Sequence, residues 1–403
     1  MTISIPRAPV DPSWPRLRWP GRPEGPLELD PAPLPTRERW GEGPVGRLAL
    51  GDNLGALAAL APGSARLAYL DPPFFSEARY LFRTQADGHP FTLPAFGDRW
   101  ADLGAYLSHL EDRLRLVARA LAPDGSLYLH LDAHAAHYAK ALLDEIFGPE
   151  AFSRQIVWRV GWVSGFKSRA RNWIRNHDLL LYYARPGAPF HRQLLPHPPG
   201  YSRRGGGEGA GRPLEDVWTD LDSIQLKSFS GEKTGWATQK NEALLGRVIR
   251  ASSDPGDLVI DPYAGAGTTA VVAARLGRRF FAADTSPLAL HLGRRRLWAE
   301  GAAFEGVGEA PEVAGPLKLR REGLRLHLEG APASAGPDEV SPLGRLDAWW
   351  IEAEGRCLCA SPRPLGRRPG RVPEALTLPP DLGPARAVAV DLAGRRHEGP
   401  IPT

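Results

Sequence analysis

The 403-residue sequence has little that would suit a membrane or an oxidising compartment. No stretch approaches the roughly 20 consecutive apolar residues of a membrane-spanning helix. The first 21 residues, MTISIPRAPVDPSWPRLRWPG, lack the apolar centre of a secretory signal peptide, so a cytoplasmic location is expected by default. Only two cysteines occur, Cys357 and Cys359, and their C-x-C spacing fits neither a zinc knuckle nor a disulfide framework. We interpret them as ordinary strand residues and expect no metal site.

Lysine is also scarce, because only six of the 50 basic residues are lysine and 44 are arginine. The net charge is +4, so overall charge does not by itself indicate a nucleic-acid partner. A GC-rich genome or a thermophilic source would account for most of the arginines, and the 41 prolines fit the same interpretation. Where arginines cluster among aromatic residues, a phosphate-binding face is a second interpretation.

Changes of pattern divide the chain into three expected parts. Residues 1–45 are rich in proline and arginine without periodicity and predict an extended N-terminal arm. Residues 46–300 alternate short apolar runs with helical patterns, except that residues 186–233 have no regular period and indicate an insertion or surface loop. Residues 301–403 alternate polar and apolar positions, which predicts a small β-rich C-terminal module.

The middle part predicts strands that alternate with helices. Strands are expected at residues 47–52, 65–70, 126–132, 177–185, 257–260 and 278–284. Helices are expected at residues 53–64, 102–125, 136–148, 241–253, 268–277 and 287–301. This order predicts an α/β fold with a doubly wound, mostly parallel sheet and helices on both of its faces.

The stretch DPYAGAGTTA, residues 261–270, follows the expected strand DLVI. Gly265 and Gly267 stand where a strand turns into a helix, so the backbone there can approach a ligand at the helix N-terminus. Asp284 comes 19 residues after Gly265, at the end of the next strand, where a carboxylate can accept hydrogen bonds from ribose hydroxyls. Asp284 could instead cap the following helix. Together the two features predict a cofactor that contains adenosine, without saying which one.

The stretch DPPF, residues 71–74, follows the buried strand LAYL. An exocyclic amino group of a base becomes a nucleophile only when acceptors hold its hydrogens, and Asp71 and the carbonyl of Pro72 are two such acceptors. Pro73 helps to fix the turn, and Phe74 offers a ring on which an extruded base can stack. A simple turn that ends a strand would explain the prolines but not the acid and the aromatic ring beside them.

DPPF together with DPYAGAGTT resembles the DNA amino-methyltransferases that use S-adenosylmethionine. GDNLGAL (51–57) and TGWATQKNEALLGRVI (234–249) resemble two further segments of that family. The catalytic motif precedes the cofactor motif, as in the circularly permuted β class, whose target-recognition region lies between the two motifs. The resemblance covers about residues 46–300 and implies a Rossmann-like methyltransferase sheet, with residues 186–233 as the recognition region. Trp-Ala stands before Thr-Gln-Lys, where the family often has proline.

The resemblance implies roles for individual residues. Asp71, Pro72, Pro73 and Phe74 are the expected catalytic turn. The expected cofactor-binding residues are Asp52, near the adenine, Thr238, Gln239 and Lys240, near the methionine part, and Asp261, Tyr263, Gly265, Gly267, Thr268 and Asp284. Adenine N6 enzymes of the family usually carry Asp-Pro-Pro, whereas cytosine N4 enzymes usually carry Ser-Pro-Pro. Adenine is therefore favoured, and cytosine C5 methylation is not, because it requires a cysteine nucleophile in the catalytic domain.

Basic and aromatic residues interleave in residues 157–178, VWRVGWVSGFKSRARNWIRNHD. This mixture suits phosphate contacts and stacking on bases, which is the favoured interpretation; the alternative is an exposed loop whose tryptophans pack on the domain. The expected DNA-binding residues here are Arg159, Lys167, Arg169, Arg171 and Arg175. A second contact is expected at Arg203 and Arg204 in YSRRGGG.

The leading hypothesis is an enzyme that flips adenine out of duplex DNA and methylates its N6 amino group. The alternatives are a cytosine N4 methyltransferase and a non-catalytic DNA-binding specificity subunit with the same fold. Duplex DNA is the expected partner, no membrane is involved, and a homodimer and a paired restriction endonuclease stay open. Neither the recognition sequence nor the role of the C-terminal module follows from the sequence.

Overall fold

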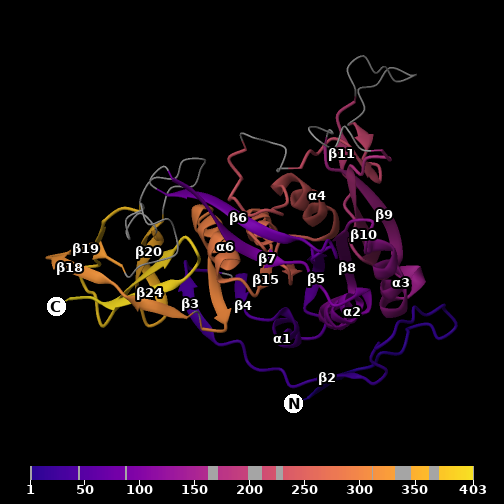
Figure 1. Ribbon diagram of the computed structural model, residues 1–403, viewed down its shortest axis with the longest axis horizontal. Coiled ribbons are helices and arrows are strands. Elements are labelled where there is room, and N and C mark those ends of the chain that lie inside the picture. Colours follow the sequence, from indigo (N-terminus) through magenta and orange to yellow (C-terminus); the bar gives the residue numbers. More distant parts are fainter. Residues whose placement is uncertain are drawn as a thin grey trace.

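The computed structural model describes residues 2–43, 46–86, 89–161, 171–197, 211–223, 230–310, 312–331, 346–362 and 372–402. The described chain forms one broad sheet (Figure 1). The strands of the middle part lie among the helices, and the C-terminal strands lie at one end of the sheet.

The central sheet confirms the expected mostly parallel arrangement. Its strands follow the order β13-β9-β10-β8-β5-β14-β15-β4-β16, and neighbours from β8 to β16 are parallel, while β10 is antiparallel to both β8 and β9. The bounds are β4 Gly46–Leu50, β5 Ala65–Leu70, β8 Leu121–Leu131, β9 Phe152–Arg159, β10 His177–Ala184, β13 Val217–Trp218, β14 Leu258–Asp261, β15 Arg279–Asp284 and β16 Phe304–Gly308.

Helices cover both faces of this sheet, as expected. Leucines and alanines of α1, α2 and α3 form one core with the sheet, and the apolar residues of α4, α5 and α6 form a second core on its other face. The bounds are α1 Asn53–Ala58, α2 Leu103–Ala120, α3 Ala136–Phe147, η1 Pro149–Ala151, α4 Glu242–Ser252, α5 Thr268–Arg275 and α6 Pro287–Ala299. In a sheet of this kind, ligands bind at the carboxyl ends of the strands.

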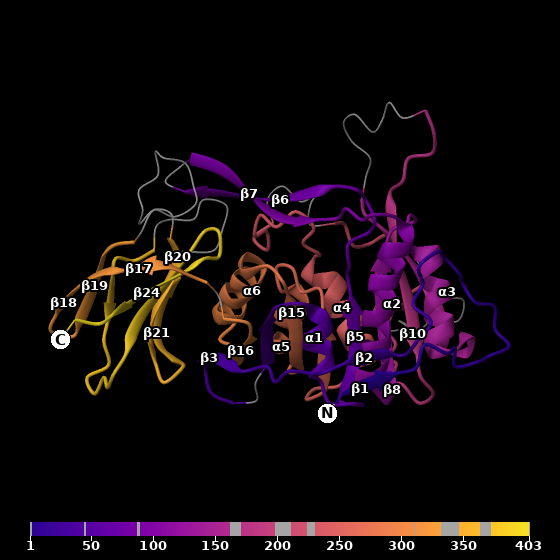
Figure 2. The same ribbon diagram turned by 60° about the horizontal axis from the view of Figure 1, so that its bottom comes forward.

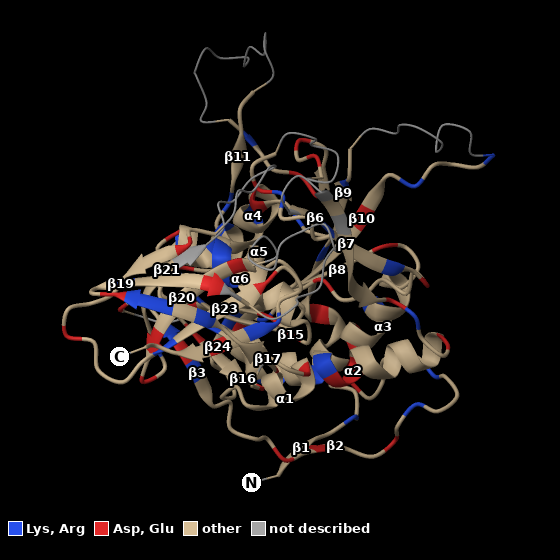
Figure 3. Cartoon of the chain, turned by 60° about the vertical axis from the view of Figure 1, so that its left-hand side comes forward, with Lys and Arg blue, Asp and Glu red and all other residues tan. Residues whose placement is uncertain are grey.

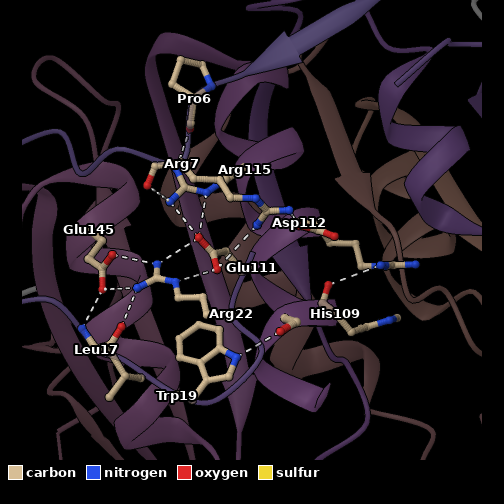
Figure 4. Close-up of polar contacts among 12 residues, drawn as sticks. Pro6, Arg7, Leu17, Trp19, Arg22, His109, Glu111, Asp112, Arg115 and Glu145 are labelled. Carbon is tan, nitrogen blue, oxygen red and sulfur yellow. Dashed lines mark hydrogen bonds and ion pairs between the residues drawn. The ribbon is translucent and has the colours of Figure 1, made fainter. Parts of the chain in front are cut away.

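The N-terminal arm lies against α2 and α3 and is joined to them by buried, charged hydrogen bonds (Figure 4). Arg22 donates to Glu111 on α2 and to Glu145 on α3, at 2.9 Å and 2.8 Å. Arg115 donates to the backbone carbonyls of Pro6 and Arg7 at 2.9 Å and 2.8 Å. Strands β1 Ile3–Ile5 and β2 Leu27–Leu29 pair with each other, and β3 Thr36–Trp40 pairs with β16. The arm is therefore extended and joined to α2, α3 and β16 at these contacts, while many of its other described residues are exposed.

The C-terminal strands join the central sheet where β21 pairs with β3 of the arm. Arg356 of β21 pairs with Arg39 of β3, and Trp350 packs edge-on against Trp40 at 5.2 Å between ring centroids. The strands β17, β20, β21, β23 and β24 complete the sheet, and β18, β19 and β22 form a smaller one. The bounds are β17 Val313–Pro316, β18 Lys318–Glu322, β19 Arg325–Gly330, β20 Leu346–Ala353, β21 Arg356–Pro362, β22 Ala375–Thr377, β23 Arg386–Asp391 and β24 Arg396–Pro400.

A long hairpin that the sequence did not predict runs across the carboxyl edge of the sheet, above α6 and β15 (Figure 2). It consists of β6 Arg79–Ala86 and β7 His89–Gly97, which pair with each other and with no other described strand. Two short strands, β11 Leu194–Leu195 and β12 Arg212–Pro213, pair with each other within the expected recognition region. Among the described residues, no helix has the length and apolar character needed to cross a membrane.

Candidate functional site

A cavity of about 260 Å³ opens at the carboxyl edge of the sheet, beside the ends of β4, β5, β14 and β15. Side chains from all four sequence motifs line it, together with residues of the β6–β7 hairpin and of α2. The predicted residues in its wall are Asp52, Asp71, Pro73, Thr238, Gln239, Lys240, Asp261, Tyr263, Gly265, Thr268 and Asp284. The parallel order of the strands explains this convergence, because their carboxyl ends meet at one edge.

Asp71 stands where β5 ends and is the acid of the expected catalytic turn. Its Oδ2 lies 2.6 Å from Nζ of Lys240, and the two side chains are 16% and 12% exposed. Its Oδ1 is buried and has no hydrogen-bond donor among the described residues. The ammonium of Lys240 also lies 5.1 Å from the centroid of the Phe74 ring. One oxygen of the carboxylate is therefore held in place while the other is left to accept a hydrogen bond.

The two prolines of the turn differ in their surroundings. Pro72 is buried, whereas Pro73 lines the cavity and its carbonyl accepts a hydrogen bond of 2.9 Å from the hydroxyl of Tyr106. The ring of Phe74 is half-buried and lies 5.8 Å from that of His130. These contacts fix the direction of the turn.

Asp98, which the sequence analysis did not single out, holds the loop that follows the turn. It is fully buried and accepts hydrogen bonds from the backbone N–H groups of Phe74, Phe75 and Ser76, from the Ser76 hydroxyl and from the indole of Trp100, at 2.6–3.1 Å. Phe75 is forced to a positive φ of 60°, which costs a non-glycine residue about 1–2 kcal/mol. Five donors on one carboxylate keep the loop in this strained shape.

The glycine-rich turn after β14 is tied to the acid at the end of β15. The backbone N–H of Gly265 donates to Asp284 at 2.9 Å, and the N–H of Ser286 donates to its other oxygen at 2.9 Å. Ser286, not Asp284, is the N-cap of α6. A Cβ at Gly265 would lie 3.1 Å from the indole nitrogen of Trp236, which lines the same cavity. A residue without a Cβ is thus favoured at position 265, where the glycine-rich turn meets the segment that carries Trp236.

Gly267 occupies a different position from Gly265. It is the N-cap of α5 with a φ of 73°, and it is not one of the residues that line the cavity in the described structure. A Cβ on Gly267 would lie 2.7 Å from the Cα of Gly293 on α6. The placement shows a close approach of two backbones, rather than a contact with the cavity.

Four acids line the cavity, Asp52, Asp71, Asp261 and Asp284, and burial raises the pKa of two of them. Burial, reinforced by the charges of Asp71 and Asp284, raises the pKa of Asp261 to about 7. Burial also raises the pKa of Asp284 above its ordinary value. A ligand that carries positive charge would stabilise the ionised forms of both carboxyl groups. The cavity is consequently suited to a cationic ligand.

The wall formed by α1 and α2 carries a polar network. Arg113 donates to Asp52 at 2.8 Å and to Asn53 at 2.7 Å, and Asp52 is also the N-cap of α1. His109 lies 3.2 Å from the hydroxyl of Tyr263, and burial, followed by the charge of Arg113, lowers the pKa of this histidine to about 4. The imidazole is therefore neutral at physiological pH.

The Thr-Gln-Lys segment uses one of its side chains to hold itself together. Gln239 accepts hydrogen bonds from the backbone and hydroxyl of Thr234 and donates to the carbonyl of Glu232. Arg296 of α6 donates to the hydroxyl of Thr268 and the carbonyl of Ala266, at 2.9 Å and 2.8 Å. The sequence analysis did not single out Arg296 or Trp236 as site residues. Arg296 lies in an ordinary helical pattern, and Trp236 was noted only because it departs from the family's Thr-Gln-Lys motif.

The residues expected to bind DNA are only partly within the described chain. Lys167, Arg169, Arg203 and Arg204 lie outside the described residues. Arg171 is exposed, and Arg159 donates to the carbonyl of Thr219 at 3.1 Å.

Arg175 is ion-paired with Asp132 and lies 3.8 Å from Asp178. Trp158 is a core residue whose indole donates to the carbonyl of Leu221, whereas Trp173 is 97% exposed. Of the two described tryptophans in this segment, one therefore belongs to the core and the other is open to solvent.

Comparison with known proteins identifies the family. The sequence model of the DNA methylases that act on N6 or N4 amino groups matches residues 65–293, more than half of the chain. The chain belongs to this DNA methylase family.

Two curated relatives of the DNA methylases are similar over most of their own length. The type II methyltransferase M2.DpnII of Streptococcus pneumoniae is 26% identical over 273 residues, which are 62% of this chain and 88% of the relative. The DNA adenine methyltransferase YhdJ of Escherichia coli (strain K12) is 27% identical over 267 residues, which are 61% and 81% of the two chains. Among solved structures, the cytosine-N4-specific PvuII DNA methyltransferase aligns with 65% of this chain and 90% of its own at 16% identity, with a TM-score of 0.44.

Family membership confirms the expected cofactor, S-adenosylmethionine. The cavity of this methylase fits that molecule on its own chemistry, because S-adenosylmethionine carries a sulfonium and an ammonium charge and the wall holds Asp71, Asp261 and Asp284. Asp284 stands where an acid can hold ribose hydroxyls.

Proposed function

We propose that this DNA methylase transfers a methyl group to the exocyclic N6 amino group of adenine in duplex DNA, after the base has been flipped out of the helix. The observation that supports this most directly is the carboxylate of Asp71, which is paired with Lys240 through Oδ2 and has a buried Oδ1 without a donor. An amino hydrogen of the target base would satisfy that oxygen. The Asp-Pro-Pro-Phe sequence and the adenine-specific relative favour adenine over cytosine.

The chemistry assigned to the residues follows from their positions. Bound in the cavity, S-adenosylmethionine supplies an electrophilic methyl group. Asp71 Oδ1 accepts a hydrogen bond from the amino group, which localises the nitrogen lone pair, and it is positioned to take the proton that this nitrogen must lose on methylation. Lys240 holds the other oxygen, and Phe74 offers its half-buried ring to the flipped base.

The cofactor is assigned to the glycine-rich turn and to the acids around it. Asp284 would accept hydrogen bonds from the ribose, and Asp261 and Asp52 would face the remainder of the molecule, as the family pattern implies. Thr238, Tyr263 and Thr268 complete this wall. Gly267 contributes through the packing of α5 on α6.

Duplex DNA is assigned to the carboxyl edge, above the catalytic turn. Arg171 and Trp173 are both exposed, and they stand just before β10 in the segment expected to contact DNA. A paired restriction endonuclease and a homodimer stay predictions from the resemblance. The described residues carry no observation that favours either one.

The test is to incubate plasmid DNA with the protein and methyl-labelled S-adenosylmethionine, digest the DNA to nucleosides and identify the labelled one. We expect N6-methyladenine, and no label when Asp71 is replaced in D71N, whose affinity for S-adenosylmethionine should stay close to that of the wild type. Label in N4-methylcytosine would contradict the adenine assignment. Absence of label from every DNA tested, with the cofactor bound normally, would instead support the non-catalytic alternative.

A further inference from the structure

The β6–β7 hairpin has two chemically different faces. Its inner face is apolar: Phe82 and Leu93 pack against Trp236 and against Leu288 and Leu292 of α6. Two-stranded hairpins are marginal on their own in water, so this packing is what holds the hairpin across the carboxyl edge.

The hairpin is also fastened to the site at two places along its length. The N–H of Arg83 donates to the carbonyl of Gly235 at 3.1 Å, and a Cβ at Gly235 would lie 2.0 Å from the Arg83 carbonyl oxygen. At the hairpin's base, the N–H of Asp98 donates to the carbonyl of Ala78 at 2.9 Å. The hairpin therefore has a fixed position relative to the catalytic turn and to the Thr-Gln-Lys segment.

The outer face of β6 is exposed and basic. Arg79, Leu81, Arg83 and Gln85 alternate along the strand and are all exposed, as the two-residue period of a strand requires. Neither β6 nor β7 contains an acidic residue. The ion pairs found among the described residues include neither Arg79 nor Arg83.

Other arginine-rich surfaces differ from this one, because acids accompany them. In the C-terminal strands, basic and acidic residues are interspersed (Figure 3): Arg320 pairs with Glu322 and Glu329, and Arg386 pairs with Glu352 and Glu398. Those arginines already have counter-charges. Arg79 and Arg83 face solvent at the edge where the substrate must approach.

We propose that the outer face of β6 binds the phosphate backbone of duplex DNA at the carboxyl edge, beside the catalytic turn. The proposal rests on the proposed function. Four residues of strand separate Arg79 from Arg83, a distance of about 13 Å, and about 13 Å of duplex carries roughly eight phosphate charges. Both guanidinium groups can thus contact one stretch of duplex.

The test measures how DNA affinity depends on salt. Binding of a fluorescent duplex of mixed sequence is followed by anisotropy over a series of salt concentrations, for the wild type, R79Q, R83Q, the double variant and R79K/R83K. Each lost phosphate contact should reduce the slope of log affinity against log salt by about 1, and the double variant should lose about 2. R79K/R83K should keep the slope close to the wild-type value.

The matched control is R154Q. Arg154 lies on β9 toward the opposite edge of the sheet, is 67% exposed and loses the same charge, so its slope should match the wild type. Cofactor affinity is measured in parallel. If the wild type binds and methylates DNA but the double variant keeps the wild-type slope, or if its lost DNA affinity follows lost cofactor affinity, the hairpin does not contact DNA. If the wild type neither binds nor methylates DNA, the proposed function itself fails, and the hairpin inference fails with it.

Discussion

Asp98 is the residue whose replacement tests most directly how the catalytic turn is held. In Asp98→Asn, one carboxylate oxygen becomes an N–H₂ group that can no longer accept hydrogen bonds. In the better orientation, the amide oxygen keeps the three donors of Oδ2, which come from Phe74 and Ser76, and the two donors of Oδ1, from Phe75 and Trp100, lose their acceptor.

The magnitude follows from the two lost hydrogen bonds. A hydrogen bond to a charged group contributes about 1.5–3 kcal/mol net, so the variant loses about 3–6 kcal/mol of preference for the present loop. The positive φ values of Phe75 and Glu77 add a tendency to relax once the carboxylate is gone. A loss of about 3 kcal/mol corresponds to a factor of roughly 100 in the population of the productive turn. We therefore expect the rate of methyl transfer to fall at least about 100-fold.

The assay is a single turnover at saturating DNA and S-adenosylmethionine, with cofactor affinity and urea unfolding measured on the same preparation. Asp102→Asn is the matched control, because Asp102 caps α2 through one hydrogen bond of 2.8 Å to Ala105 and asparagine caps helices equally well. The control should keep the wild-type rate. A wild-type rate in Asp98→Asn would refute the reasoning, and a parallel loss of stability and cofactor affinity would show that Asp98 supports the fold rather than the turn.

Three further predictions concern the cofactor wall and the arm. Gly267→Ala should lower the free energy of unfolding by about 2–4 kcal/mol, because its Cβ would lie 2.7 Å from Gly293 and its φ is positive. The control Gly55→Ala, with open space around it, should not lower stability, and urea midpoints measure both. Unchanged stability with lost cofactor binding would instead show that Gly267 contacts the cofactor. Affinity for S-adenosylmethionine should rise by up to about tenfold per pH unit as the pH approaches 7 from below, and should then level off. The reason is that the cationic cofactor favours the ionised form of Asp261, whose pKa is about 7. In titration calorimetry, Asp261→Asn should remove this pH dependence. Arg22→Met should lower the free energy of unfolding by about 1.5–3 kcal/mol, because buried Glu111 and Glu145 each lose a charged donor, although Glu111 keeps Arg115; a urea midpoint equal to that of the wild type would contradict this.

Much of the catalytic part of the fold could be predicted because its signals are local and periodic. The expected strand at residues 65–70 coincides with β5, Ala65–Leu70, and the helices α2 and α4 fall within their expected ranges. The motif residues could also be expected to converge, because three of the four motifs follow parallel strands. Topology then brings Asp71, Asp261 and Asp284 to one edge although they are far apart in the sequence.

The missed elements have physical reasons. Strand β7 contains Pro90 and Pro94, and prolines argue against a strand unless its edge is free of a further partner. The hairpin satisfies that condition because β6 and β7 pair only with each other among the described strands. Asp98 is one acid in the loop sequence GDRW, and nothing local marks it as the acceptor for a turn more than 20 residues earlier.

Arg175 shows the opposite limit of sequence reasoning. Its composition-based assignment to DNA was reasonable, since it lies among basic and aromatic residues, but the side chain is ion-paired with Asp132 at the end of β8. Because Asp132 is itself buried, this pair belongs to the base of the loop. A charge count along a segment cannot tell which arginines find partners within the protein.

The helix α2 connects the arm with the site and gives the arm a consequence for catalysis. One face of α2 places His109 and Arg113 in the cavity wall. Another face places Glu111 where it accepts a hydrogen bond from Arg22. Because a helix moves as a stiff body, contacts on its arm side constrain the position of Arg113, which in turn holds Asp52 at the cofactor wall. The arm, although outside the family match, thus fixes one side of the cofactor site through a single helix.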